Sequence, residues 1–167
     1  SLTQADPSSW HGTRVAAMTS AATGNATGVA AGTWNGSVLP VRVLGKCGGY
    51  DSDIVAGMRW AAGLPVAGVP PNPNPARIPN LSLGGAGSCA SVYANAITEL
   101  TAAGILVVAS AGNDSGPVES PANCAGVLAV GGLRHVGTKV GYSSLGPEIS
   151  VSAPAGNCPS TPLLCEY

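Results

Sequence analysis

The sequence has few charged residues, few histidines and no long apolar run, and each shortage excludes a class of protein. Only 9% of the 167 residues are charged and the net charge at pH 7 is -1, so no basic surface is available to nucleic acid. No apolar stretch approaches the roughly 20 residues that cross a bilayer. No signal peptide begins the chain, so a secreted protein with this sequence would be a processed form. We therefore expect neither a nucleic-acid nor a membrane partner.

What the sequence does contain is typical of one folded domain. Apolar residues make up 45% of the chain, which excludes the composition of disordered proteins. A chain of 167 residues is long enough to bury a substantial core. No internal repeat and no linker divides it, so we predict a single domain over residues 1–167, and a monomer.

Strand-like and helix-like segments alternate along the chain. Ser52 is a candidate N-cap for a helix, and Gly63 and Gly104 are suited to end helices. The predicted strands are residues 38–44, 78–83, 105–109, 127–130 and 149–151, and the predicted helices are residues 53–62 and about 91–103. This alternation indicates an α/β fold with a mainly parallel sheet flanked by helices.

The five cysteines indicate disulfides rather than a zinc site. They stand at positions 47, 89, 124, 158 and 165, and no Cys-x-x-Cys pair occurs. Disulfides imply an oxidising compartment, although five reduced cysteines in a cytosolic protein remain an alternative. Cys47 and Cys89 each follow a predicted strand, so we predict that they bond with each other. For the remaining three, Cys124–Cys158 is the preferred pair, with the choice left open.

Two segments about a hundred residues apart carry residues suited to catalysis. His11 lies in Ser9-Trp10-His11-Gly12-Thr13 at the start of a predicted helix. The positive end of the helix dipole there disfavours imidazolium, which keeps a neutral base available. Asn113 ends the segment Ser110-Ala111-Gly112-Asn113 just after a buried strand, where its amide could donate to an oxyanion. Together they suggest half of a serine-protease active site.

These segments and several others resemble the subtilases, the subtilisin-like serine proteases. The resemblance runs from about residue 9 to residue 156. The segment Val43-Leu44-Gly45-Lys46-Cys47-Gly48-Gly49-Tyr50 is most similar to secreted bacterial members of the family. The remaining matching segments are His11-Gly12-Thr13, Asn80-Leu81-Ser82-Leu83-Gly84, Ala111-Gly112-Asn113, Ser120-Pro121-Ala122, Tyr142-Ser143-Ser144-Leu145-Gly146 and Ala153-Pro154. The resemblance implies a three-layer subtilisin-like fold and a secreted serine endopeptidase made as a zymogen.

The resemblance also assigns roles. His11 would be the general base and Asn113 the side-chain donor to the oxyanion. A polypeptide substrate would lie between two edges and against small pocket walls. The residues of those edges and walls are Gly48, Gly49, Tyr50, Ser82, Leu83, Gly84, Gly85, Ala109, Ser110, Ala111 and Gly112. The loop over residues 22–29 resembles the family's calcium loop, with Asn25 offering its side-chain oxygen and Ala22, Thr27 and Val29 their carbonyls.

The sequence departs from the family at two catalytic positions. The family's aspartate lies about thirty residues before the histidine, whereas only ten residues precede His11 here. The nucleophile's Gly-Thr-Ser-Met-Ala motif, expected well after Pro154, is not reached by Tyr167. Ser143 and Ser144 belong to another family segment and are not assigned as the nucleophile. We therefore expect residues 1–167 alone to be inactive, with the other triad members on other segments of the same protease.

Two alternatives remain. The chain could be a non-catalytic module with the subtilase fold that only binds peptide. A more distant alternative is a dinucleotide-binding domain, because Gly85-Ala86-Gly87-Ser88-Cys89-Ala90 matches a Gly-x-Gly-x-x-Ala pattern after a predicted strand. That short match leaves His11 and Asn113 unexplained.

Overall fold

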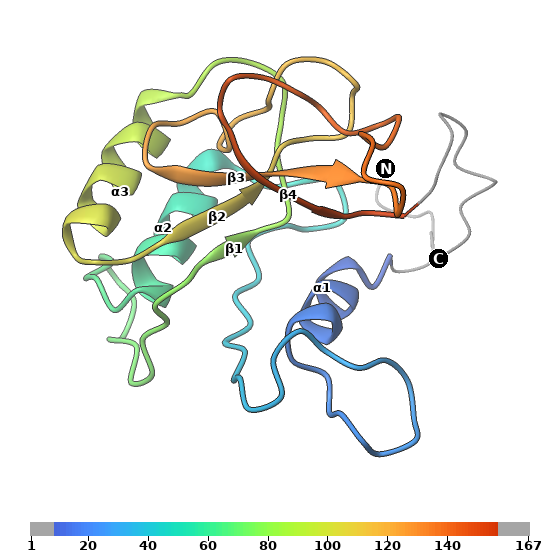
Figure 1. Cartoon of the computed structure of the whole chain (residues 1–167). Helices are drawn as coiled ribbons and strands as arrows, with labels where there is room; N and C mark the ends of the chain where they lie inside the picture. Colours follow the sequence, from blue (N-terminus) through green and yellow to red (C-terminus); the bar gives the residue numbers. More distant parts are fainter. Residues whose placement is uncertain (1–8, 157–167) are drawn as a thin grey trace. The chain divides into compact units, whose positions relative to one another are not determined.

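The computed structural model describes residues 9–156 (Figure 1). They belong to two compact units, one ending at Tyr50 and one beginning at Asp51. The prediction of a single domain stays a prediction. No helix within residues 9–156 is long and apolar enough to cross a membrane.

The first unit contains the helix α1, His11–Ser20. It begins at the predicted histidine, and the backbone N–H of His11 donates to the Ser9 hydroxyl at 3.4 Å. Residues 38–44 form no strand, which corrects the prediction. A strand exists only through ladder partners, and Pro40 removes one of the N–H donors that such a ladder needs. The chain turns instead at an antiparallel bridge between Gly45 and Gly48.

The second unit is built on a four-stranded, fully parallel sheet with the strand order β1-β2-β3-β4. The strands are β1 (Asn80–Leu81), β2 (Val107–Ser110), β3 (Val127–Leu133) and β4 (Ile149–Pro154). In β2 the side chains alternate between buried and half-buried, with Val107 and Ala109 inside. The predicted α/β fold with a parallel sheet is confirmed, although β1 is shorter than predicted and β3 and β4 are longer.

Two helices pack beside this sheet, and Figure 1 shows them side by side. They are α2 (Asp51–Ala61) and α3 (Ser91–Ala102). Helix α2 begins two residues before the predicted start, so Ser52 lies inside the helix and is not its N-cap. The apolar faces of the helices bury Ile54, Met58, Ile97 and Leu100.

Both helices end where glycine permits a left-handed residue. Gly63 has φ 82° and Gly104 has φ 74°. After each glycine, the next residue donates its N–H back into the last turn, Leu64 to Arg59 O at 2.9 Å and Ile105 to Leu100 O at 3.0 Å. This is the Schellman arrangement, and it confirms both predicted ends. Because Ile105 follows directly, α3 delivers the chain into β2.

Candidate active site

A cavity of about 310 Å³ lies in the second unit at the carboxyl ends of its strands. This is the edge of a parallel α/β sheet at which ligands bind. Asn113, the predicted oxyanion donor, lines it with an exposed side chain. The other lining residues are Asn80, Ser82, Val108, Ala109, Ser110, Ala111, Gly112, Val130, Gly131, Gly132, Tyr142, Ser143, Ala153, Pro154 and Ala155.

Backbone hydrogen bonds fix the loop that carries Asn113. Ala111 N donates to Val130 O of β3 at 2.9 Å, and Gly112 O accepts from Ser144 N at 3.0 Å. The backbone N–H of Asn113 donates to Oε1 of Glu119 at 3.0 Å. Gly112 has φ 110°, a conformation that L side chains rarely adopt. Three consecutive residues are thus held on different partners, which fixes the backbone from which the Asn113 side chain extends.

Ser143, which lines the cavity, and its neighbour Ser144 are both buried. Ser143 is 3% exposed and Ser144 is fully buried. The Ser143 hydroxyl accepts from Gly132 N at 2.9 Å and donates to Ser144 O at 3.1 Å. A hydroxyl already engaged with two backbone groups is poorly placed to attack a substrate, and the fully buried Ser144 is inaccessible to one. Neither serine is assigned as a nucleophile.

The predicted substrate-binding residues fall into three groups. Ser82 and residues 109–112 line the cavity. Leu83, Gly84 and Gly85 directly follow β1, outside the cavity lining. Gly48, Gly49 and Tyr50 belong to the first unit, where they are exposed.

His11, the predicted general base, also belongs to the first unit and is exposed at the N-terminus of α1. That His11 and Asn113 face the same site therefore stays a prediction. The imidazole stands on the first residue of the helix, as the sequence predicted, next to the positive end of the helix dipole.

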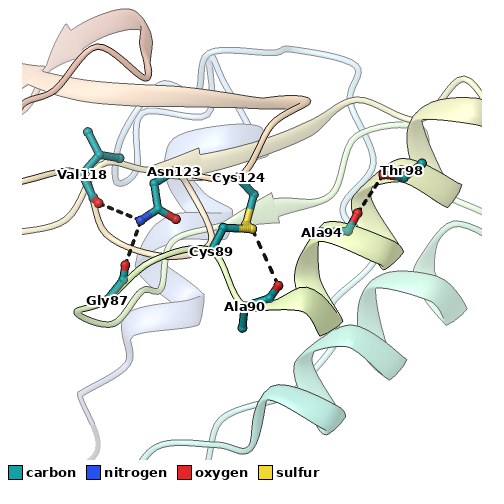
Figure 2. Close-up of a disulfide and its surroundings, with 8 residues drawn as sticks. All are labelled: Gly87, Cys89, Ala90, Ala94, Thr98, Val118, Asn123 and Cys124. Atoms are coloured by element: carbon teal, nitrogen blue, oxygen red, sulfur yellow. Dashed lines mark hydrogen bonds between the residues drawn. A yellow bond between two sulfur atoms is a disulfide. The ribbon is translucent and has the colours of Figure 1, made fainter.

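A disulfide joins the loop after β1 to the loop between β2 and β3. It links Cys89 to Cys124, with Cα atoms 5.0 Å apart (Figure 2). The predicted pairs Cys47–Cys89 and Cys124–Cys158 are therefore wrong. The first prediction assumed a strand before Cys47, and residues 38–44 do not form one. Cys47 is an exposed free cysteine, while Cys158 and Cys165 lie outside the described residues.

Further contacts connect the same two loops. Gly85 and Ser120 exchange backbone hydrogen bonds of 2.9 and 3.0 Å. Figure 2 shows the Asn123 amide donating to the carbonyls of Gly87 and Val118. The glycine-rich segment 85–90 is thus engaged with a neighbouring loop. The N–H of Gly85, the first glycine of the pattern, is already bonded to Ser120 O, which disfavours the dinucleotide-binding alternative.

Sequence reasoning missed Glu119. Besides holding Asn113 N, its carboxylate lies against two of the predicted pocket glycines, because a Cβ at Gly112 would overlap Oε1 and a Cβ at Gly84 would lie 3.1 Å from Oε2. The only sequence signal was an acidic residue directly before the motif Ser120-Pro121-Ala122, a region otherwise poor in charge.

The predicted calcium loop offers oxygens but no carboxylate. Asn25 Oδ1 accepts the N–H of Thr27 at 3.0 Å, which leaves it a second lone pair. With the carbonyls of Ala22, Thr27 and Val29, the loop provides four of the six to eight oxygens that calcium takes. Within residues 9–156 no three His, Cys, Asp or Glu side chains cluster as metal ligands. Calcium binding by this loop stays a prediction.

Two extracellular proteases are similar to this chain in sequence. The chain is 50% identical over 156 residues to an extracellular protease of Xanthomonas campestris, covering 92% of this chain and 27% of that protein. It is 44% identical over 156 residues to an extracellular basic protease of Dichelobacter nodosus, covering 92% of this chain and 26% of that protein. The chain thus spans about a quarter of the length of these curated relatives.

A solved structure and a family model agree with these relatives. The structure of a protease from Pseudoalteromonas arctica superposes with a TM-score of 0.88 at 48% identity, covering 91% of this chain and 45% of that one. The family model described as the subtilase family matches residues 2–167. This chain belongs to the subtilase family.

Proposed function

We propose that the complete protein carrying this chain is a secreted serine endopeptidase, and that this segment provides His11 and Asn113 to its active site. The observation that supports the proposal most strongly is the placement of Asn113. It follows β2 at the carboxyl edge of the sheet, lines the cavity there, and is held by its backbone on Glu119. Its segment matches the family in which such an asparagine serves as an oxyanion donor.

In the proposed mechanism, the neutral imidazole of His11 takes the proton from a serine hydroxyl as that oxygen attacks the scissile carbonyl. The Asn113 amide donates a hydrogen bond to the negative charge that forms on the carbonyl oxygen. The imidazolium then gives its proton to the leaving amine, and a water repeats the sequence to release the acid. The catalytic serine and aspartate would come from other segments of the protein.

The family resemblance assigns substrate binding to backbone segments and small residues of this chain. An extended polypeptide would pair with the backbone of Ser82, Leu83 and Gly84 on one side and of Gly48, Gly49 and Tyr50 on the other. Gly84, Gly85 and residues 109–112 would form the walls of the pocket for the side chain on the acyl side of the scissile bond. We propose polypeptides as the substrates and the extracellular space as the location, as in the named relatives.

Calcium is proposed as a structural ion held partly by the loop over residues 22–29. Asn25 Oδ1 and the carbonyls of Ala22, Thr27 and Val29 would be ligands, with the remaining oxygens supplied from outside this loop. Calcium should then raise the melting temperature of the complete protein, and Asn25→Ala should reduce that increase. An equal response to calcium in both proteins would contradict the assignment.

The activity is tested by the kinetics of the complete protein with casein and with chromogenic peptides. Removing one oxyanion donor costs about 10²–10³ in kcat, a magnitude measured within this family and carried over here. We expect Asn113→Ala to lose about that factor with little change in KM, and His11→Ala to be inactive while still folded. Peptide binding without hydrolysis by the unmodified protein would instead support the non-catalytic module.

A further inference from the structure

The Glu119 carboxylate lies between two backbone segments that the proposed function assigns to the walls of one substrate pocket. Oε1 fills the space that a Cβ at Gly112 would take, and Oε2 lies 3.1 Å from the position of a Cβ at Gly84. Gly112 follows β2 and Gly84 follows β1, so the acid stands where the two walls approach each other. A Cβ at Gly112 would overlap the carboxylate, whereas a Cβ at Gly84 would only make a tight contact with it.

This position is built into the fold from several sides. The Glu119 backbone N–H donates to Ala111 O at 2.9 Å, and the next residue, Ser120, exchanges two backbone hydrogen bonds with Gly85. The disulfide Cys89–Cys124 crosslinks the same two loops (Figure 2). The backbone at Glu119 and Ser120 is thus hydrogen-bonded to both wall segments, which restricts where the carboxylate can lie.

Within residues 9–156, no lysine or arginine neutralises the charge of this acid. Glu119 is half-buried, and among the described residues it forms no ion pair with a lysine or arginine. Its Oε1 accepts one backbone N–H, whereas an ionised carboxylate has about four acceptor positions. The pocket therefore has a localised negative charge with acceptor capacity to spare.

We propose that Glu119 makes the enzyme selective for a positively charged side chain, arginine or lysine, on the acyl side of the scissile bond. This rests on the proposed endopeptidase function and specifies its substrate class. An ammonium or guanidinium entering between the two walls would donate to the carboxylate in a partly desolvated space, where charge-assisted hydrogen bonds are strongest. A substrate glutamate at that position would meet a like charge and be rejected.

Glu119 could instead act only on Asn113, by holding its backbone N–H. Such a positioning role would change the rate for every substrate by the same factor. Selectivity changes the ratio between substrates. Glu119→Gln separates the two, because the amide oxygen still accepts the Asn113 N–H while the charge is lost.

The experiment compares kcat/KM of the complete protein on peptides that differ only in the acyl-side residue: arginine, lysine, norleucine, leucine or glutamate. Norleucine matches the lysine stem without the ammonium. We expect the unmodified enzyme to prefer lysine over norleucine by at least tenfold, since hydrogen bonds to charged groups are worth roughly 10- to 100-fold. Glu119→Gln should remove most of that preference and change the leucine rate less than about threefold.

The matched control is Glu148→Gln, which removes the charge of an exposed glutamate and should leave the lysine-to-norleucine ratio unchanged. Equal rates for lysine and norleucine in the unmodified enzyme would overturn the proposal without requiring any variant. An equal loss on all peptides in Glu119→Gln would also overturn it, in favour of positioning. If no peptide is cleaved at all, the proposed endopeptidase function fails instead.

Discussion

The disulfide Cys89–Cys124 allows the most quantitative prediction from this structure. It closes a loop with a sequence separation of 35 residues, and the chain-entropy model assigns such a crosslink about 4 kcal/mol of stability. Replacing both cysteines by alanine should therefore lower the free energy of unfolding by about that amount. Alanine is preferable to serine, because Cys124 is only 4% exposed and a buried hydroxyl without a partner would add its own cost.

The measurement is urea unfolding of the complete protein followed by fluorescence, in a His11→Ala background that is expected to be inactive and so to avoid self-digestion. Cys47→Ala is the control, since Cys47 is exposed and free. It should change the free energy of unfolding by less than about 0.5 kcal/mol. A loss below about 1 kcal/mol in the double variant, or a larger loss in the Cys47→Ala control than in the double variant, would contradict this prediction.

Two further predictions concern the helices. Burial raises the pKa of Tyr93, with additional contributions from its hydrogen bond to Asp51 and from the charge of that carboxylate. Because the folded state then resists ionisation of Tyr93, its contribution to stability is complete below the ordinary tyrosine pKa of about 10 and falls as the pH rises above it. The free energy of unfolding should therefore fall less at alkaline pH in Tyr93→Phe than in the unmodified protein. Equal falls in the two proteins would contradict this. Gly63→Ala and Gly104→Ala both place alanine at positive φ, at a cost of about 1–2 kcal/mol, but only at Gly63 would the Cβ also meet a side chain, Pro75 at 2.9 Å. Gly63→Ala should therefore be the more destabilising of the two in thermal unfolding, and the opposite order would show that the Pro75 contact relaxes freely.

Most features that depend on local sequence were predicted, although the Ser52 N-cap was wrong. Gly63 and Gly104 indicated the ends of α2 and α3, because only glycine adopts positive φ readily and helix ends need such a residue. The start of α1 at His11 and the loop after β2 that carries Asn113 were found from apolar patterning next to glycine. The parallel sheet followed from the alternation of these elements.

Features that depend on which segments meet were predicted poorly. Residues 38–44 have the composition of a strand, but a strand requires partners that composition does not name. The pairing of Cys89 with Cys124 depends on the loop after β1 meeting the loop after β2, which the spacing of cysteines does not reveal. Glu119 was missed for the same reason, since its importance comes from contacts with Gly84 and Gly112 that its position in the sequence does not reveal.

Catalysis by a serine that His11 activates is tested most directly by the intact mass of the complete protein after treatment with a serine-directed fluorophosphonate. Such a reagent reacts with a serine only when an adjacent base activates its hydroxyl. We expect one adduct with full loss of casein hydrolysis, and peptide mapping should place that adduct on a serine other than Ser143 and Ser144. His11→Ala should form no adduct at the same exposure. An unmodified protein that takes up no reagent, or a His11→Ala variant that is labelled as fast as the original, would contradict this expectation.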